Sequence, residues 1–311
     1  MAKIESVNIS TQKGTVKQSV ESVLLRVGHG IEGDAHAGSW HRQISLLARE
    51  SADKMTALGI ENLSDGIFAE NITTSGISLH TLPVGTRLRL GKTLVEVTQI
   101  GKECHSDCEI FKKVGKCIMP TEGIFAQVIE GGEIRAEDAI AIEYRPISVW
   151  ILVSSDKGAR GEREDLSGPA LADCLKNCAV VQGIKILPDE RAILSEFMRR
   201  VSDDGLADII FTSGGTGLAP RDVTPEATKD IIEREVPGIP EAMRAKSMEY
   251  TDKAMLSRAT AGIRNHTLII NLPGSPKAVK ECFEVIRDVI PHAVETLRGE
   301  ASDCAALREN K

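Results

Sequence analysis

The sequence predicts two domains of different fold class. An N-terminal β-barrel is expected over residues 1–145, and a C-terminal three-layer α/β domain with a mostly parallel sheet over residues 146–311. The chain has 311 residues, a length that suits two hydrophobic cores better than one. Many short β-type runs with glycine turns and few helices indicate the barrel. Alternating strand-like and helical segments indicate the α/β domain.

The first half contains mainly short apolar runs of the β type. One helix is expected over Ala48 to Leu58, ending at Gly59. The stretch from Gly28 to Gly38 contains four glycines and two histidines and therefore predicts a loop. The expected strands are Ile4 to Ile9, Val20 to Val27, Ile44 to Leu47, Phe68 to Ile72, Arg87 to Leu90, Thr93 to Ile100, Ile124 to Ile129 and Ala139 to Tyr144.

In the second half, which follows Arg145-Pro146, strands and helices alternate. Ligands of such sheets bind at the carboxyl ends of the strands. The expected strands are Ile147 to Val153, Val180 to Leu187, Asp208 to Phe211 and Leu268 to Asn271. The expected helices are Ser167 to Cys178, Glu190 to Val201, Pro225 to Glu235, Pro240 to Tyr250, Ser275 to Val289 and His292 to Leu297.

The stretch Phe211 to Thr228 organises the chain. A buried strand runs into a glycine-rich turn, and Thr224-Pro225 then predicts the N-cap and first turn of a helix. Three glycines in four positions leave room for an anion to approach backbone N–H groups, as in a phosphate cradle. Asp222 follows at the far lip, where a carboxylate suits a magnesium ion. The alternative is a tight turn without a ligand.

The second half resembles the molybdopterin adenylyltransferase family, the MogA/MoaB type also found as the G domain of gephyrin. The resemblance rests on five blocks in the same order, of which the glycine loop is one. The other four are Ser154-Ser155-Asp156, Gly161 to Pro169, Leu187-Pro188-Asp189-Glu190 and Asn271 to Pro276.

This resemblance implies transfer of AMP from ATP to the terminal phosphate of molybdopterin, with Mg²⁺ bound and pyrophosphate released. Because the attacking group is already an anion, the reaction needs charge neutralisation and in-line placement rather than a strong base. Asp189 and Asp222 match the family's two functional carboxylates for catalysis and magnesium, although each could instead be a helix cap. The residues expected to bind phosphate or wall the substrate pocket are Ser154, Asp156, Thr212, Ser213, Gly214, Gly215, Thr216, Gly217, Asn271, Pro273 and Gly274.

The first half resembles the MOSC domain, named for the C-terminal region of molybdenum cofactor sulfurases. This resemblance implies a β-barrel that binds molybdenum cofactor or handles its sulfur, with a family cysteine aligning on Cys104. Cys108 and Cys117 follow as additional thiols, so a structural zinc site and inert thiols remain alternatives. His36 is the second candidate, although it could simply order its loop. The matching pieces are Gly33 to Gly38, Gln43 to Leu47, Gly66 to Asn71, Gly101 to Cys104 and Val128 to Ile134.

Composition narrows the range of partners. The net charge is −7 and no basic stripe occurs, which argues against nucleic acid or an anionic membrane as a partner. No signal peptide and no apolar span is apparent, so a cytoplasmic protein with reduced cysteines is expected. The resemblances imply a homo-oligomer, trimer or hexamer, and contacts with other cofactor-biosynthesis proteins or apo-molybdoenzymes. A non-catalytic cofactor carrier or storage protein is the main alternative. An α/β domain that acts on another nucleotide, as in relatives found in competence-associated proteins, is the second.

Overall fold

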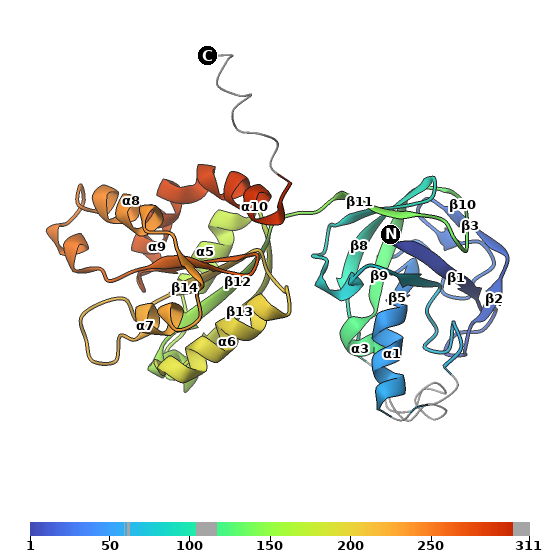
Figure 1. Cartoon of the computed structure of the whole chain (residues 1–311), viewed down its shortest axis with the longest axis horizontal. Helices are drawn as coiled ribbons and strands as arrows, with labels where there is room; N and C mark the ends of the chain where they lie inside the picture. Colours follow the sequence, from blue (N-terminus) through green and yellow to red (C-terminus); the bar gives the residue numbers. More distant parts are fainter. Residues whose placement is uncertain (59, 61–62, 104–116, 301–311) are drawn as a thin grey trace, which may run out of the picture. The chain divides into compact units, whose positions relative to one another are not determined.

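The computed structural model describes residues 1–300 apart from 59, 61–62 and 104–116 (Figure 1). The chain divides into two compact units, one ending at Pro146 and the other beginning at Ile147. Within the described residues, no helix combines the length and the apolar character that crossing a membrane requires.

The first unit is built on an eight-stranded sheet in the order β11-β7-β8-β9-β5-β6-β1-β2. A smaller sheet, β10-β3-β4, accompanies it. Alternate residues of the strands face one aliphatic core that includes Ile4, Leu46 and Val95. The strands are β1 (Lys3–Ile9), β2 (Gln18–Val20), β3 (Ser22–Arg26), β4 (Gly30–Ile31), β5 (Ile44–Ala48), β6 (Ile72–Ser75), β7 (Arg87–Leu90), β8 (Thr93–Ile100), β9 (Ile124–Glu130), β10 (Gly132–Arg135) and β11 (Ile140–Tyr144).

The structure does not confirm the closed barrel that the sequence predicted for this unit. The large sheet is mixed, because β5 and β6 pair in parallel, and it has two edges, β2 and β11. Among the described residues, β1 and the start of β11 are linked by an isolated bridge between Lys3 and Ala139 and by a few backbone hydrogen bonds beside it, such as Ile140 N to Ala2 O at 2.9 Å, but no ladder forms between the two strands. The glycine turns that led to the barrel prediction are local features of the strands. Closure of a sheet into a barrel depends instead on pairing between edge strands that are far apart in the sequence.

A second, smaller core lies beneath the helices of this unit. Leu47, Met55, Phe68, Met119 and Phe125 form this cluster. The predicted helix is present but begins one residue later and ends one residue earlier than expected. The helical segments here are α1 (Arg49–Ala57), η1 (Leu79–Thr81) and α3 (Met119–Glu122).

The second unit has a six-stranded mixed sheet in the order β13-β12-β14-β17-β16-β15. The first four strands are parallel, and the last two run antiparallel at one edge. The predicted helix from Pro225 to Glu235 is shorter than expected, because Arg234 and Glu235 form an edge strand instead. The strands are β12 (Ser148–Ser154), β13 (Val180–Leu187), β14 (Ile209–Ser213), β15 (Arg234–Glu235), β16 (Ala261–Arg264) and β17 (Thr267–Leu272).

Helices cover both faces of this sheet and complete three layers (Figure 1). On β12, Val149 and Ile151 face a core shared with α5, α8, α9 and α10, whereas Leu152 faces the core shared with α6 and α7. This period of two is what a strand buried on both faces requires. The helical segments are α4 (Asp156–Ala159), α5 (Ser167–Leu175), α6 (Arg191–Asp203), α7 (Thr224–Lys229), α8 (Gly238–Ser247), η2 (Asp252–Leu256), α9 (Pro276–Ile286), η3 (Arg287–Val289) and α10 (Ile290–Arg298).

A buried ion pair ties the last helix to the starts of the central strands. Asp208, just before β14, accepts hydrogen bonds from Arg298 Nε at 2.9 Å and from Ser148 N and Oγ, both at 2.7 Å. Burial by itself would raise the pKa of the Asp208 carboxyl, but the hydrogen bonds from Arg298 and Ser148 outweigh it and hold this pKa below its ordinary value. The charged form is therefore part of the folded state.

Replacing Arg298 with methionine should lower the free energy of unfolding of the second unit by about 3–5 kcal/mol, because it leaves a buried carboxylate without its charge partner. Arg160→Met, which breaks an exposed pair with Glu162, should change it by less than about 1 kcal/mol. Urea unfolding can be followed by Trp150 fluorescence in a Trp40→Phe background. Equal losses in the two variants would contradict a special role for the buried pair.

Candidate functional site

The carboxyl ends of four parallel strands meet at one edge of the second sheet. Residue pairing places Ser154 opposite Leu187, Val153 opposite Ser213, and Ser213 opposite Leu272. The polar segments that follow these strands therefore converge, as the sequence predicted for a parallel sheet.

The glycine loop after β14 fits only because its first two residues lack side chains. Gly214 and Gly215 have φ angles of 96° and 64°, in the region where other residues are strained. A Cβ on Gly214 would lie 2.5 Å from the carbonyl oxygen of Ser154, and one on Gly215 would overlap Thr224 Oγ1. The loop is thus packed between the end of β12 and the start of α7.

Three N–H groups of this loop are left without acceptors. Among the described residues, the N–H groups of Gly215, Thr216 and Gly217 donate no hydrogen bond, whereas Gly214 N donates to Leu272 O at 3.3 Å. Thr224 Oγ1 is also buried without a partner in the described chain. Buried and half-buried donors without acceptors are uncommon in native proteins, and here they line a cradle.

Three residues that the sequence predicts as ligand contacts have side chains that form hydrogen bonds within the protein. Asn271 is fully buried, and its amide nitrogen donates to Thr212 Oγ1 at 3.0 Å and Thr228 Oγ1 at 2.8 Å. Its Oδ1 accepts from Thr260 N at 3.2 Å. Ser213 Oγ donates to Pro273 O at 3.0 Å. The side chains of Thr212, Ser213 and Asn271 are thus used within the protein, and they fix β14, β17 and α7 to one another.

Asp189 lies where β12 and β13 end, and its carboxylate does not cap α6. Ser154 Oγ donates to Oδ1 at 2.6 Å, and Asp156 N donates to Oδ2 at 3.0 Å. In return, Asp189 N donates to Asp156 Oδ1 at 3.0 Å. The N-cap of α6 is Glu190, and it makes no side-chain capping bond. The carboxylate of Asp189 therefore faces the strand ends.

Asp156 is already neutralised by Arg221 from the loop before α7. Arg221 Nε and Nη2 donate to its two carboxylate oxygens at 3.0 and 2.6 Å. These hydrogen bonds hold the pKa of the Asp156 carboxyl below its ordinary value. Asp156 thus connects the β12 edge to the glycine loop through a bidentate pair.

Asp222 closes the far end of the loop. Its Oδ2 accepts from Ala219 N at 2.9 Å, and Asp222 N donates to Ala219 O at 2.9 Å. A Cβ on Gly217 would lie 2.8 Å from the same Oδ2, so the carboxylate is directly beside the loop. Its other oxygen accepts no hydrogen bond from the described residues.

Arg258 is a residue of this site that the sequence reasoning missed. Its Nε donates to Gly217 O at 2.6 Å, and its other nitrogens donate to Asp222 O and to Glu226. Arg258 N also donates to Thr216 O at 3.0 Å. No sequence pattern distinguishes this arginine from others, because its partners lie more than 30 residues away.

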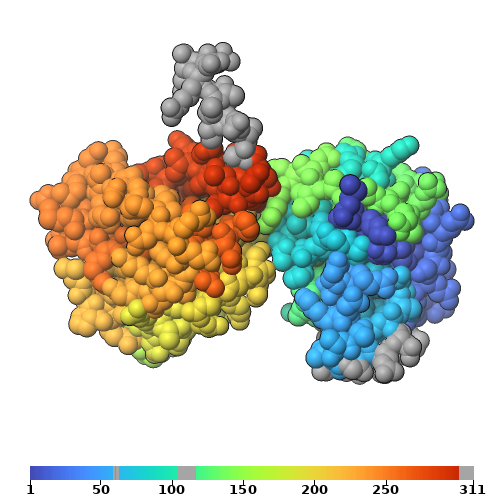
Figure 2. All heavy atoms as spheres, viewed as in Figure 1, coloured from blue at the N-terminus to red at the C-terminus, as the bar shows by residue number. Residues whose placement is uncertain are grey.

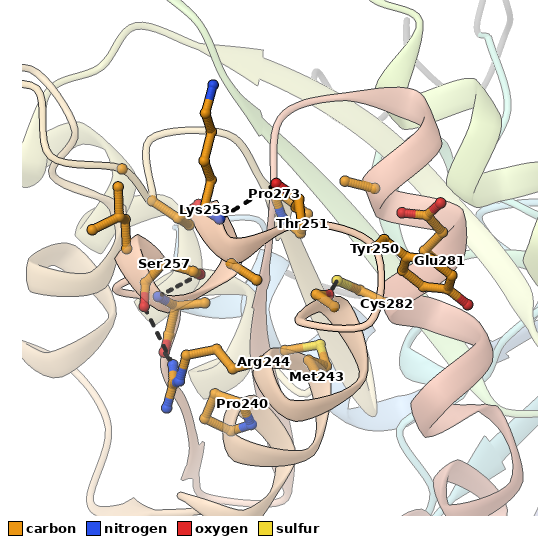
Figure 3. Close-up of a pocket in the computed structure, with 17 residues that line it drawn as sticks. Pro240, Met243, Arg244, Tyr250, Thr251, Lys253, Ser257, Pro273, Glu281 and Cys282 are labelled. Atoms are coloured by element: carbon orange, nitrogen blue, oxygen red, sulfur yellow. Dashed lines mark hydrogen bonds between the residues drawn. The ribbon is translucent and has the colours of Figure 1, made fainter.

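Two cavities adjoin the loop. A polar one of about 180 Å³ is bordered by Ser154, Arg163, Ser167 and Gly214. A larger one of about 280 Å³ lies beside Thr216, Gly217 and Pro273, and helix α8, η2 and α9 form most of its wall (Figure 3). No sequence motif pointed to a residue of α8 or η2 as part of a pocket. The orange segment that contains α8 lies at the surface of the unit (Figure 2).

Two predicted residues of the first unit, Cys104 and Cys108, lie outside the described residues. Cys117 is half-buried and packs against the small core that contains Met55 and Phe68. His36 lines a cavity and is described below. No group of three or more His, Cys, Asp or Glu side chains that could hold a metal ion occurs within the described part of the chain.

Comparison with known proteins gives matches in both halves. Residues 33–141 match the model of the MOSC domain, and residues 150–292 match the family described as "Probable molybdopterin binding domain". The molybdopterin adenylyltransferase of Helicobacter pylori (strain J99) is 41% identical over 156 residues, which cover 49% of this chain and 89% of that protein. Gephyrin of Dictyostelium discoideum is 41% identical over 157 residues, covering 47% of this chain and 22% of gephyrin. The solved structure of MoaB from Thermus thermophilus has 45% identity and a TM-score of 0.47, covering 49% of this chain and 97% of that one.

The second unit is thus an α/β domain with a glycine-loop site at the carboxyl edge of its parallel strands. Through this unit the chain belongs to the molybdopterin adenylyltransferase family of the MogA/MoaB and gephyrin type, and its first half carries a MOSC domain. The sequence motifs predicted both memberships.

Gly215→Ala should destabilise the second unit more than Gly161→Ala does. Both glycines have positive φ, so each alanine costs about 1–2 kcal/mol of backbone strain. Only Gly215 also lacks space for a Cβ, whereas Gly161 has nothing within 4 Å, and overpacking adds about 1–3 kcal/mol. Urea unfolding of the two variants measures the difference. Equal stabilities would mean that the loop does not approach Thr224 this closely.

Proposed function

We propose that the second unit transfers AMP from ATP to the terminal phosphate of molybdopterin and releases pyrophosphate. The observation that carries this proposal is the cradle of Gly215, Thr216 and Gly217, whose three N–H groups lack acceptors among the described residues and which lies between two cavities. The similarity to the molybdopterin adenylyltransferase of Helicobacter pylori supports the choice of molybdopterin as the acceptor of an adenylyl group. A glycine cradle flanked by two cavities suits a reaction that joins two phosphate-bearing molecules.

In this proposal the chain positions anions and neutralises their charge. The free N–H groups of the loop bind phosphate oxygens, and Arg258 keeps the loop in shape by holding Gly217 O and Asp222 O. Because the nucleophile is a phosphate oxygen, no side chain has to remove a proton. The rate enhancement then comes from orientation and from preorganised donors.

The chain fits a magnesium ion that arrives with the nucleotide rather than one held by a dedicated cage. Mg²⁺ is commonly bound by one or two carboxylates together with substrate phosphates and water. Asp222 has an oxygen without a hydrogen bond from the described residues, and Asp189 faces the same strand ends. When bound, the ion would neutralise phosphate charge. We assign Asp222 and Asp189 as its ligands.

We assign the two cavities to the two substrates according to their linings. The polar cavity beside Ser154 and Ser167 suits the ribose and phosphates of ATP. The larger cavity, with Met243, Tyr250 and Ala254 among its walls, suits a planar pterin. The sequence placed Asn271 in the wall of the nucleotide or pterin pocket, but its side chain is fully buried, so this assignment does not use it.

For the first unit we propose binding of molybdenum cofactor or handling of its sulfur, which would place two steps of one pathway in one chain. The MOSC match supports this proposal. A cytoplasmic location and a trimeric or hexameric assembly are further expectations. Light scattering on the purified chain tests the assembly.

Asp222→Asn should reduce the rate of adenylyl transfer roughly 100-fold, the scale associated with one preorganised electrostatic group. The amide keeps a carbonyl oxygen for the Ala219 N–H but carries no charge for the metal. The assay combines ATP, Mg²⁺ and molybdopterin and measures the adenylylated product. The variant should also respond less steeply to magnesium concentration. Asp173→Asn, at an exposed position on α5, is the control and should remain active; if Asp222→Asn retains most of the activity, the assignment is wrong.

Ser247→Leu should raise the KM for molybdopterin roughly tenfold, because the larger side chain enters the α8 cavity. Ser247 lines this cavity beside Cys282. Binding of ATP, measured by calorimetry, should be unchanged. Glu249→Leu, two residues further on and exposed, is the matched control. A change in ATP affinity with no change in the KM for molybdopterin would reverse the assignment of the two cavities.

A further inference from the structure

A cavity of about 220 Å³ in the first unit is lined by three basic side chains. Arg42, His36 and Lys102 border it, and no Asp or Glu is among the described residues of its wall. The whole chain, by contrast, has a net charge of −7. A cavity wall that presents basic side chains and no carboxylate attracts anionic ligands.

Arg42 is held by aromatic rings rather than by a carboxylate. Its guanidinium carbon lies 4.7 Å from the centroid of the Trp40 ring and 5.5 Å from that of Phe125. Its Nε is buried and has no hydrogen-bond partner among the described residues. Buried donors of this kind are nearly always satisfied in native proteins. A guanidinium with fixed orientation and unused donors matches the geometry of an oxyanion.

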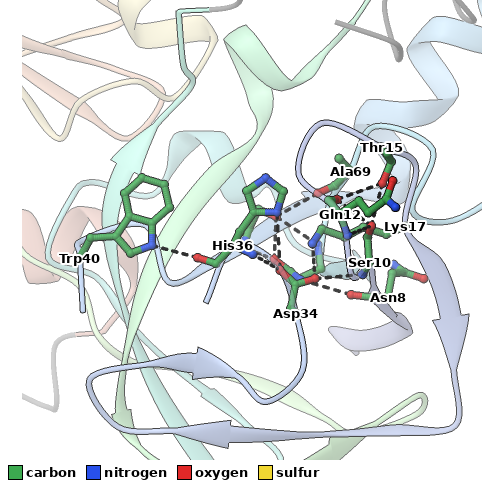
Figure 4. Close-up of polar contacts among 11 residues, drawn as sticks. Asn8, Ser10, Gln12, Thr15, Lys17, Asp34, His36, Trp40 and Ala69 are labelled. Atoms are coloured by element: carbon green, nitrogen blue, oxygen red, sulfur yellow. Dashed lines mark hydrogen bonds and ion pairs between the residues drawn. The ribbon is translucent and has the colours of Figure 1, made fainter. Parts of the chain in front are cut away.

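His36 is oriented by a buried acid–base pair (Figure 4). Its Nδ1 lies 3.6 Å from Asp34 Oδ1, which also accepts a hydrogen bond from His36 N at 3.0 Å. The other oxygen of Asp34 accepts from Ser10 N at 3.0 Å and pairs with Lys17. Both charged side chains are only 1% exposed. Trp40 Nε1 donates to His36 O at 3.0 Å, so the histidine and the stacked arginine belong to one fixed segment.

The charge on Asp34 is retained despite its burial. Burial would raise the pKa of the Asp34 carboxyl, but hydrogen bonds from His36 and Lys17 and the charge of Lys17 outweigh burial and hold this pKa well below its ordinary value. The ionised carboxylate of Asp34 thus lies beside Nδ1 of the His36 ring. Figure 4 shows the second ring nitrogen on the side away from Asp34, where it can donate to an anionic ligand when both ring nitrogens carry a proton.

The other polar groups of the cavity wall are already used. Ser45 Oγ donates to Asn71 Oδ1 at 3.0 Å, and Asn71 Nδ2 donates to Asn8 O at 3.2 Å. Among the side chains of the described lining residues, those of Arg42, His36 and Lys102 therefore remain as donors for a ligand.

We propose that this cavity binds an oxyanion, either free or as the phosphate of an organic monoester, between Arg42, His36 and Lys102. Arg42 provides the directed donors, Lys102 adds charge, and Asp34 and Lys17 act only through His36. The site is distinct from the glycine loop of the second unit and does not depend on adenylyl transfer. It deepens the role proposed for the first unit by naming the group that is recognised.

The test uses Trp40 as a local reporter in the full-length chain. The protein contains two tryptophans, and Trp150→Phe leaves Trp40 as the single one. Titration with inorganic phosphate should change Trp40 fluorescence in a saturable manner. Phosphate bound only at the glycine loop would leave this signal unchanged, so the readout separates the two sites. An unchanged or non-saturable signal overturns the proposal.

Matched variants test each assigned side chain. Arg42→Gln should weaken phosphate binding at least tenfold, whereas Arg26→Gln, which breaks an exposed pair with Glu32, should leave it within twofold. Because Arg42 itself contacts Trp40, Lys102→Gln provides a second variant and should weaken binding severalfold. His36→Gln should also weaken phosphate binding severalfold. His41→Gln, which loses a contact with Gln99, should leave the affinity for phosphate unchanged. Unchanged affinity in Arg42→Gln and Lys102→Gln overturns the proposal.

A second ligand distinguishes the two sources of the oxyanion. Phenyl phosphate should bind more tightly than inorganic phosphate if the natural ligand is an organic monoester, because Trp40 and Phe125 offer ring faces beside Arg42. Equal affinities would indicate a free oxyanion. Both results support the site, and failure of both ligands to bind excludes it.

Discussion

The second unit depends on one close approach, that of the Gly214-Gly215 backbone to the end of β12 and the start of α7. The loop can pass between Ser154 O and Thr224 Oγ1 only without a Cβ on either glycine. The buried amide of Asn271 fixes the same region by joining Thr212 to Thr228. β14, β17 and α7 are held in this way, and the next three N–H groups donate no hydrogen bond within the described residues. Packing therefore creates the cradle, and the cradle makes the proposed chemistry possible.

The carboxylates at this edge combine a structural role with the chemical role proposed for them. Asp189 holds Ser154 and the first turn of α4, and Asp222 holds the turn that contains Ala219. A rigid carboxylate needs little reorganisation when a charged ligand binds, which favours electrostatic stabilisation of a transition state. The stability of the loop and its proposed function are therefore connected through the same two side chains.

The charged side chains discussed above have different partners in the two units. In the second unit, Arg258 and Arg221 are engaged by backbone oxygens or carboxylates, so the cradle relies on N–H groups. In the first unit, Asp34 of the buried Lys17–Asp34 pair contacts His36, and the guanidinium of Arg42 lies against aromatic rings. A buried pair contributes little net stability, but it fixes the orientation of the group it contacts. The cationic cavity is consistent with that use.

The sequence by itself determined the α/β class of the second unit, most of the strands and both family memberships. Strands β7, β8 and β13 have the predicted bounds, because alternation of apolar residues is a local property. Only the tertiary structure decided that the first sheet is open and mixed, since closure requires pairing between distant edges. The end of the helix predicted from Pro225 to Glu235 is likewise replaced by strand β15, which pairs with β16, and the helix itself ends at Lys229. The roles of Arg258 and of the α8 cavity likewise come from neighbours distant in the chain. Arg42 contacts the nearby Trp40, but its second ring contact, Phe125, also comes from a distant segment. Local patterns specify elements and motifs, whereas cavities and unused donors arise only when those elements pack.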